Sequence, residues 1–282
     1  MARKNGIEGK LKTGLRISGA ARRFGVDLRR KLFAQIHDTF GGRLRLFIAG
    51  AAAIDPSVAK GFRDLGISFL QGYGITECSP IVALNRDKRY RDNAAGLALP
   101  GMEIKLINQD ENGIGEIVCR GGNVTLGYYK NPEADAEAFV DGWFRTGDLA
   151  MIDKDGFFII TGRKKNVIVT KNGKNIYPEE LEYLVNKYQE VKDCMVIGEF
   201  SEKDQDTLLG IQVLPDLDYI KETYGEKSPE EVEKIINDVV LKVNKRNVIY
   251  KYIRNVYLRD DEFVKTTTKK IKRHAQAPLQ PK

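Results

Sequence analysis

The stretch LRLFIAGAAAIDPSVAKGFRDLGISFLQGYGITE, residues 44–77, decides the fold of this chain. Residues 44–48 alternate and then become apolar, as a strand does, and residues 67–71 have a similar texture. Between them Asp55 and Pro56 form a typical helix start, with the aspartate as N-cap and the proline at the first helical position. A strand, a helix and a second strand in this order predict a parallel sheet.

The two turns that follow these strands are the first candidate ligand site. In open parallel sheets, ligands bind beyond the carboxyl ends of the strands, so residues 50–51 and 72–77 are expected to face one site. The second turn combines the aromatic ring of Tyr73, the hydroxyl of Thr76 and the carboxylate of Glu77. This set suits a nucleotide with bound Mg²⁺, although an ordinary turn at a strand end is the alternative.

The remaining sequence predicts an antiparallel layer and a second domain. Short β-prone stretches separated by Gly, Asn and Asp turns favour an antiparallel sheet or small barrel up to about Thr161. Helices are expected over 28–40, 178–188 and 229–246, and strands over 193–199 and 209–214. The predicted fold is therefore α/β and α+β: a large domain over 1–161, with an α/β part (1–95) and a β-barrel-like part (96–161), and a small mobile α+β domain over 162–282.

Composition limits the class of protein. A chain of 282 residues with 42% hydrophobic and 30% charged residues is in the range of folded soluble proteins. Its longest apolar run, Leu46–Ile54, is shorter than the roughly 20 residues of a membrane-spanning helix, and its first ten residues lack the apolar centre of a signal peptide. A cytoplasmic location is expected. The three cysteines are too far apart for a zinc site and odd in number, which predicts reduced thiols.

The net charge of +7 points to anionic ligands. Lys and Arg gather in Lys242–Arg273, but aromatic residues are sparse there and no nucleic-acid motif is present. A phosphate-rich small ligand fits this stretch better than nucleic acid, and peripheral contact with an anionic membrane is a further expectation. Taken alone, its end Lys265–Arg273 could equally be a solvated basic tail.

Two further segments carry groups that suit a sugar and a phosphate. Asp148, in Trp143–Leu149, can accept two hydrogen bonds from the vicinal hydroxyls of a sugar, although an aspartate at a turn is usually a cap. Arg163, in Gly162–Asn166 between the expected domains, can grip a ribose or a phosphate beside a flexible glycine.

In order and approximate spacing, these segments resemble the adenylate-forming superfamily of acyl-CoA synthetases, adenylation domains and luciferases. The similarity runs from about Phe47 to Arg273 and includes further segments at 115–121, 127–129 and 173–182. It implies an enzyme that activates a carboxylate with ATP to an acyl-adenylate, releases pyrophosphate and, in many members, transfers the acyl group to coenzyme A. The implied cofactors are ATP or AMP, Mg²⁺ and coenzyme A.

The resemblance also implies residue roles at the nucleotide. Tyr73 corresponds to the aromatic that lies against adenine, and the backbone walls of that pocket correspond to Gly50, Ala51 and Gly72. Thr76 corresponds to the hydroxyl that binds the α-phosphate. Glu77 corresponds to the carboxylate that binds Mg²⁺, a hard oxygen ligand for a hard ion.

The later segments correspond to the mobile part of the family's site. Asp148 matches the ribose-binding aspartate and Arg163 the arginine that supports it. Lys270 matches the lysine that bridges the substrate carboxylate and the α-phosphate, but Lys269 stands where the motif usually has glycine. The remaining matches are the hinge, at Lys165, and the loop that lines the pantetheine tunnel, with Lys171, Asn172 and Gly173. A polar β-turn is the alternative for that loop.

One expected element has no counterpart in the sequence. The family's Ser/Thr/Gly-rich loop ending in Pro-Lys-Gly, which wraps the β- and γ-phosphates, resembles nothing in Met1–Phe40. The chain alone is therefore expected to be inactive. Strands next to residues 44–48 and 67–70 would also be missing, so association with another copy or with the missing N-terminal half is expected.

The favoured function is a fatty acid–CoA ligase, here in truncated form. It is favoured by the basic, Thr-rich segment Lys265–Arg273 and by Cys78-Ser79-Pro80 after Glu77. The alternatives are an aryl- or amino-acid-activating adenylation domain and a non-catalytic AMP-binding module.

Overall fold

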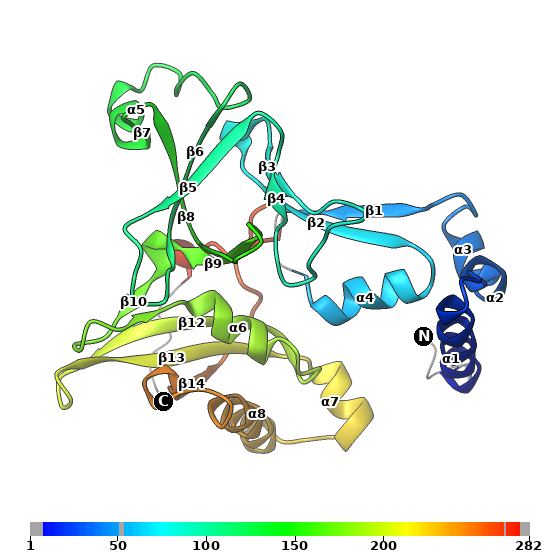
Figure 1. The fold of residues 1–282 in the computed structure, drawn as a ribbon. Coiled ribbons are helices and arrows are strands. Elements are labelled where there is room, and N and C mark those ends of the chain that lie inside the picture. Colours follow the sequence, from blue (N-terminus) through cyan, green and yellow to red (C-terminus); the bar gives the residue numbers. More distant parts are fainter. Residues whose placement is uncertain (1–7, 51–53, 268, 277–282) are drawn as a thin grey trace. The chain divides into compact units, whose positions relative to one another are not determined.

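The computed structural model describes residues 8–50, 54–267 and 269–276 (Figure 1). It contains two compact units. The first unit is built from residues 1–146 and 150–160, and the second from residues 147–149 and 161–282. The division into a large domain over 1–161 and a small mobile domain over 162–282 stays a prediction.

The first unit contains the predicted parallel strand pair. Strand β1 (Leu46–Ala49) pairs in parallel with β2 (Ser68–Gly74), and α4 (Pro56–Asp64) connects them (Figure 1). The carboxylate of Asp55 accepts a hydrogen bond from the backbone N–H of Ser57 at 2.7 Å, which confirms the predicted N-cap. Strands β3 (Ile81–Leu84) and β4 (Leu97–Ala98) extend the sheet antiparallel, in the order β1-β2-β3-β4.

The N-terminal helices differ from the prediction. A single helix over 28–40 is wrong, because the chain forms α2 (Arg29–Leu32) and α3 (Ala34–Thr39) with a break at Phe33. Phe33 has φ −112° and ψ 28° and is 6% exposed, and a Cβ on Gly14 would lie 3.0 Å from its ring. Gly14 belongs to α1 (Glu8–Arg23). At the break between α2 and α3, the Phe33 ring therefore packs against α1.

The predicted antiparallel layer is a five-stranded sheet. Its strand order is β5-β6-β8-β7, and β9 also pairs with β8. The strands are β5 (Met102–Ile107), β6 (Gly115–Gly121), β7 (Phe139–Val140), β8 (Trp143–Ile152) and β9 (Phe158–Arg163), and α5 (Pro132–Ala138) precedes β7. The buried core beside this sheet includes Cys78, Val82, Met102, Cys119 and Phe144. As expected from their number and spacing, the three cysteines are free thiols.

The second unit has the predicted α+β composition. Strands β12 (Val191–Ser201) and β13 (Asp206–Pro215) are antiparallel, and β14 (Ile253–Leu258) joins β13 in parallel. The core lies between this sheet and α6 (Pro178–Val185) and α8 (Pro229–Asn244), the latter with a capping box of Ser228 and Glu231. Helix α7 (Leu217–Tyr224), strand β14 and the two-stranded ribbon β10 (Ile168–Val169) and β11 (Asn175–Ile176) were not anticipated.

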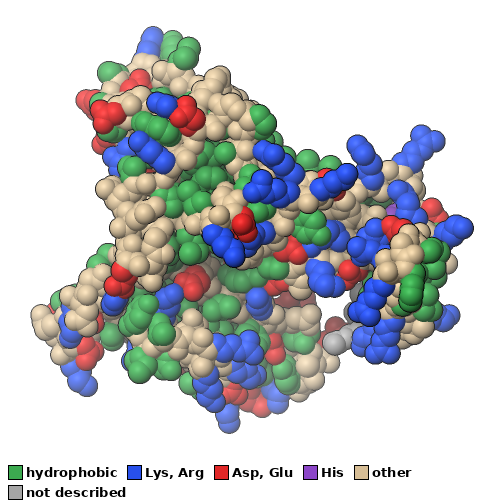
Figure 2. Space-filling model, viewed as in Figure 1, with side chains coloured by type: hydrophobic (Ala, Val, Ile, Leu, Met, Phe, Trp, Pro, Cys, Tyr) green, Lys and Arg blue, Asp and Glu red, His purple; other side chains and the backbone are tan. Residues whose placement is uncertain are grey.

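Surface charge is distributed over both units. Figure 2 shows Lys and Arg side chains gathered over α1–α3 of the first unit, in addition to those of the second. In the part of the chain that the structure describes, no helix combines the length and the apolar character needed to cross a membrane.

Candidate functional site

The carboxyl ends of β1 and β2 lie together, as the sequence predicts for a parallel pair. A Cβ on Gly50 would lie 3.8 Å from the carbonyl oxygen of Gly72, so the two backbones are neighbours at this edge. A Cβ on Gly74 would clash with the carbonyl oxygen of Pro80, where β3 returns along β2. Glycine at 74 therefore permits the chain to reverse directly after β2. Ala51 lies outside the described residues.

The three side chains expected to meet the nucleotide divide between a strand and a turn. Tyr73 belongs to β2 rather than to the turn, is half-buried, and its ring packs against the core that includes Cys78 and Phe144. Thr76 and Glu77 belong to the single 3₁₀ turn η1 (Thr76–Cys78), in which Thr76 is exposed and Glu77 half-buried. The turn therefore leaves a hydroxyl and a carboxylate accessible beyond the end of β2.

Glu77 has a partner that the sequence did not reveal. The hydroxyl of Tyr128 donates a hydrogen bond to Oε1 of Glu77 at 3.0 Å. Burial, followed by this bond, raises the pKa of the Tyr128 phenol above its ordinary value, so the hydroxyl stays protonated and remains a donor at neutral pH. The triplet Gly127-Tyr128-Tyr129 was visible as a family-like segment, but its sequence contains nothing that links it to Glu77.

Asp148 and Arg163 contact each other within the second unit. Nε of Arg163 donates to Oδ1 of Asp148 at 2.8 Å, and the side chains are 48% and 8% exposed respectively. Both residues belong to strands, Asp148 to β8 and Arg163 to the end of β9, so Asp148 is not the turn residue that the sequence suggested. The contact holds a carboxylate in place while about half of the guanidinium side chain stays accessible.

The residues after Arg163 form a short turn. Lys165 is an exposed residue of the 3₁₀ turn η2 (Lys164–Asn166). Beside it, Nδ2 of Asn166 donates to Oε1 of Glu179 at 2.6 Å, and a Cβ on Gly162 would lie 2.6 Å from the other carboxylate oxygen of Glu179. Glycine at 162 therefore lets the start of α6 approach this turn. The hinge role of Lys165 stays a prediction.

Lys171 and Gly173 lie in the tight loop between β10 and β11. The N–H of Gly173 donates to the carbonyl of Thr170 at 2.9 Å, and Gly173 has φ +71°, which favours glycine. The backbone N–H of Lys171 donates to Oδ1 of Asp206 at 2.7 Å, and its Nζ donates to the carbonyl of Asp204 at 3.0 Å. These bonds attach the loop to the β12–β13 hairpin.

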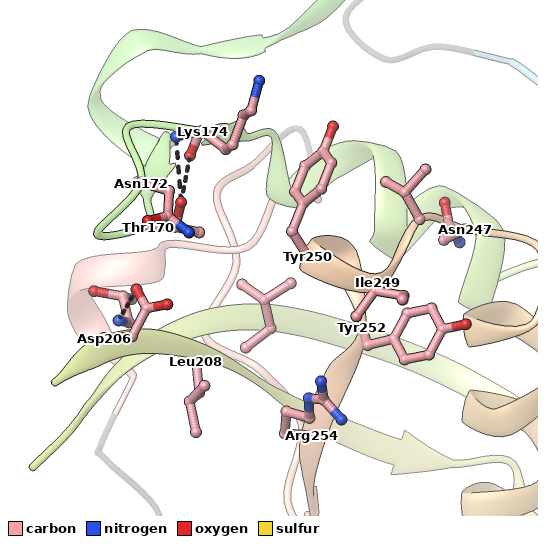
Figure 3. Close-up of a pocket in the computed structure, with 13 residues that line it drawn as sticks. Thr170, Asn172, Lys174, Asp206, Leu208, Asn247, Ile249, Tyr250, Tyr252 and Arg254 are labelled. Atoms are coloured by element: carbon pink, nitrogen blue, oxygen red, sulfur yellow. Dashed lines mark hydrogen bonds between the residues drawn. The ribbon is translucent and has the colours of Figure 1, made fainter. Parts of the chain in front are cut away.

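This loop forms one wall of a cavity of about 570 Å³ within the second unit (Figure 3). The opposite wall is the segment from Asn247 to Arg254, which includes the 3₁₀ turn η3 (Ile249–Lys251). The lining combines aliphatic side chains with the rings of Tyr250 and Tyr252 and with the cations Lys174 and Arg254. In Figure 3 the side chains of Lys174 and Tyr250 extend in the same direction from the two walls. Such a lining suits a ligand with both a flat ring and anionic groups.

Lys270 lies on an anchored terminal loop. The N–H of Lys270 donates to Oγ1 of Thr266 at 3.1 Å and its carbonyl accepts from the N–H of Thr266 at 2.8 Å, while its side chain is exposed. Lys269 has φ +61°, the left-handed region that favours glycine. This backbone angle is a physical reason for the glycine that the family motif usually has there.

Arg273 connects this loop to the interior of the second unit. Its guanidinium donates to Oε1 of Glu182 at 2.5 Å and to the carbonyl of Val196 at 2.9 Å. Burial raises the pKa of Glu182 to about 7, although Arg273 and the N–H of Val196 act in the opposite direction. The anchor of the Lys270 loop is therefore a partly buried ion pair whose acid titrates near neutral pH.

Comparisons with known proteins show which family and which enzymes this chain is similar to. A model of the family "AMP-binding enzyme" matches residues 17–129. The long-chain-fatty-acid–CoA ligase FadD15 of Mycobacterium bovis is 35% identical over 170 residues, which cover 60% of this chain and 28% of that protein. A long-chain-fatty-acid–CoA ligase of Salmonella typhimurium is 36% identical over 189 residues, covering 64% of this chain and 33% of that protein.

Solved structures agree on the fold. The anthranilate–CoA ligase AuaEII in complex with anthranoyl-AMP matches 82% of this chain and 43% of that chain, with a TM-score of 0.66 and 25% identity. The chain thus spans about a third of the length of the curated relatives given above and less than half of this solved enzyme.

Replacing Lys269 by glycine should stabilise the terminal loop. A non-glycine residue in the left-handed region costs about 1–2 kcal/mol, and glycine adds roughly 0.5–1 kcal/mol of entropy to the unfolded chain, so a net gain of about 0.5–1 kcal/mol remains. Hydrogen exchange of the Thr266 and Lys272 amides should become slower. Lys272→Gly is the matched control, because Lys272 has φ −82° and glycine there should speed exchange. Faster exchange of these amides in Lys269→Gly would contradict the idea that the left-handed backbone at Lys269 is strained.

Stability of the second unit should fall as pH rises from about 4.5 to about 7. The folded pKa of Glu182, about 7, lies above its ordinary value of 4.5, so the folded chain binds the extra proton in this window and loses that advantage as pH increases. Each unit of pKa difference corresponds to roughly 1.4 kcal/mol. Hydrogen exchange of β12 and β13, corrected for intrinsic rates, measures the slope.

Glu182→Gln should flatten this slope, because the amide does not titrate and resembles the protonated carboxyl that the folded chain holds below about pH 7. Glu202→Gln is the control, because it removes an exposed carboxylate from the β12–β13 turn and should leave the slope unchanged. An unchanged slope in Glu182→Gln would assign the pH dependence to another group.

Proposed function

We propose that the chain carries the adenylate-binding groups and the thiol-acceptor loop of a fatty acid–CoA ligase, which the match of the AMP-binding enzyme family to residues 17–129 and the similarity to fatty acid–CoA ligases support. The observation that carries the proposal is the ion pair of Asp148 and Arg163 at 2.8 Å, formed by the two residues to which the family resemblance gives the ribose site. An ionised carboxylate accepts hydrogen bonds of the kind that vicinal hydroxyls donate, and the arginine fixes its orientation.

The proposed reaction has two steps. A carboxylate oxygen of the fatty acid attacks the α-phosphorus of ATP, and pyrophosphate leaves with the electron pair of the broken bond. The thiol of coenzyme A, as thiolate, then attacks the acyl carbon, and AMP leaves. Lys270 supports the first step, since its exposed ammonium has no carboxylate partner among the described residues and can stabilise the charge that builds at phosphorus.

The residues present fit the Mg²⁺ that this chemistry uses. Glu77 is half-buried, its Oε1 accepts from Tyr128, and its Oε2 accepts no hydrogen bond from any described residue. Mg²⁺ is commonly held by one or two carboxylates together with substrate phosphates, so Glu77 would hold the ion and Thr76 would bind a phosphate oxygen next to it. The ion supplies charge neutralisation at the phosphates.

The fatty-acid class is proposed because the two fatty-acid ligases match 60% and 64% of the chain at 35% and 36% identity. The aryl-activating alternative is supported by a feruloyl-CoA synthase of Amycolatopsis, which matches 55% of the chain at 36% identity, and by the solved anthranilate ligase. Coenzyme A is proposed as the thiol, with its nucleotide end at the cavity beside Lys174 and Arg254, because that cavity offers tyrosine rings and cations together.

Asp148→Ala should weaken AMP binding by about 1.5–3 kcal/mol, roughly 10- to 150-fold, because a charged hydrogen-bond partner of the ribose is lost. Isothermal titration calorimetry of the whole chain measures the change. An unchanged affinity would remove Asp148 from the site. In the same assay a fatty acyl sulfamoyladenosine should bind more tightly than a benzoyl analogue, and the reverse order would favour the aryl class.

Arg254→Ala should weaken coenzyme A binding about 10-fold and leave AMP binding unchanged. Its guanidinium lies 5.7 Å from the ring centroid of Tyr252 and has no carboxylate partner in the described part of the chain, so it is available to a phosphate. Titration of coenzyme A and of 3′-dephospho-coenzyme A separates a phosphate contact from a ring contact. Asp148→Ala serves as the reciprocal control, since it should leave coenzyme A affinity intact. Equal loss of both ligands in Arg254→Ala would indicate a global defect instead.

A further inference from the structure

The loop between β6 and α5 holds the turn that carries Thr76 and Glu77. Nδ2 of Asn123 donates to the carbonyls of Cys78 and Ile81 at 2.7 and 3.0 Å. The backbone N–H of Thr125 donates to the carbonyl of Glu77 at 2.7 Å, and the hydroxyl of Tyr128 reaches its carboxylate at 3.0 Å. All of these contacts lie within the first unit, so they form one locally fixed assembly.

The loop is itself held by the start of α5. The backbone N–H of Tyr128 donates to Oδ1 of Asp135 at 2.7 Å, and the side chain of Asn131 caps α5 by accepting from the N–H of Ala134 at 3.1 Å. Gly127 has φ +150°, and a Cβ there would lie 2.9 Å from the carboxylate of Asp135. The absence of a side chain at Gly127 thus lets Asp135 reach the backbone next to it. Tyr128 is fixed at its backbone as well as at its hydroxyl.

The hydrogen bond to Glu77 has an asymmetric effect on the carboxylate. Tyr128 occupies Oε1, and no described residue donates to Oε2. A phenol is a neutral donor, so it fixes the rotation of the carboxylate without cancelling its negative charge. The same residue therefore leaves one oxygen oriented, charged and unoccupied in the turn that also carries the exposed Thr76.

We propose that Tyr128 is a positioning residue that orients Glu77 to receive the Mg²⁺ of MgATP, an inference that rests on the proposed function. Hydrogen-bond partners of metal-binding side chains typically contribute 10- to 100-fold to metal affinity by fixing the ligand before the ion arrives. In the absence of the phenol, the Glu77 side chain rotates freely, and binding of the ion has to order it.

The test is the Mg²⁺ dependence of ATP binding. Calorimetric titrations of ATP into the whole chain at a series of Mg²⁺ concentrations give the concentration needed for half of the affinity gain. Tyr128→Phe keeps the ring and removes only the hydroxyl, so this concentration should rise about 10-fold or more while the affinity for metal-free ATP stays the same. A merely structural role would lower the melting temperature and leave the Mg²⁺ dependence unchanged.

The neighbouring tyrosine is a matched control. Tyr129 is 87% exposed, and its ring centroid lies 5.2 Å from Nζ of Lys130, so Tyr129→Phe should behave as the unmodified chain does. The variant Glu77→Gln tests whether Tyr128 acts through Glu77. In that background Tyr128→Phe should cause no further loss of Mg²⁺ dependence. A crystal structure of Tyr128→Phe should show the Glu77 carboxylate in a different rotamer with the turn otherwise unchanged.

The outcomes separate the two levels of the hypothesis. If ATP binding by the unmodified chain does not respond to Mg²⁺, the metal role of Glu77 is wrong and this inference is overturned with it. If the unmodified chain responds and Tyr128→Phe responds equally, only the role of Tyr128 is wrong. Additive losses in the double variant would also overturn it, since they would mean that Tyr128 acts through another group.

Discussion

Close backbone contact between β2 and β3 is the constraint on which the candidate site depends. Cβ atoms on Gly72 and Gly74 would meet the side chain of Leu84 and the carbonyl of Pro80, so glycine at both positions lets β3 lie directly against the end of β2. The chain must then reverse between Gly74 and Ile81, and the 3₁₀ turn in this reversal brings Thr76 and Glu77 to the carboxyl edge of the parallel pair. The same two glycines therefore permit the packing of β3 against β2 and the placement of Thr76 and Glu77.

In the second unit, ion pairs rather than glycines hold the loop that carries Lys270. Lys270, the proposed catalytic lysine, is exposed, and the loop that carries it is attached on both sides by ion pairs. Lys265 pairs with Asp193 at 2.5 Å and Arg273 with Glu182 at 2.5 Å, on the two sides of Lys270. The partly buried pair costs desolvation energy, which is visible as the raised pKa of Glu182. The attachment is therefore specific in geometry but sensitive to pH.

Features that neighbouring residues determine could be predicted from the sequence, and features that distant residues determine could not. The cap at Asp55 and the parallel strand pair follow from local signals, and the structure has both. The break at Phe33 depends on burial against Gly14, in a different helix. The partners Tyr128 and Glu77 are 51 residues apart, and Arg273 and Glu182 are 91 apart, so no spacing rule connects them. The sequence did show that Lys269 departs from the family's glycine, but only the backbone angle gives the departure a physical meaning.

The distribution of cations changes how the positive charge is interpreted. The sequence assigned the excess charge of Lys242–Arg273 to anionic ligands as a group, yet several of these residues have acidic partners within the second unit. Lys251 pairs with Glu180, and Arg259 pairs with Asp261 besides donating to Gln212. The positive charge of these residues is neutralised by acidic partners within the unit. An ion pair at the surface fixes local geometry and contributes little to the free energy of unfolding. Affinity for a phosphate-bearing ligand should therefore depend on the few cations without acidic partners in the described structure, Arg254 and Lys270 among them, rather than on the total charge of the stretch.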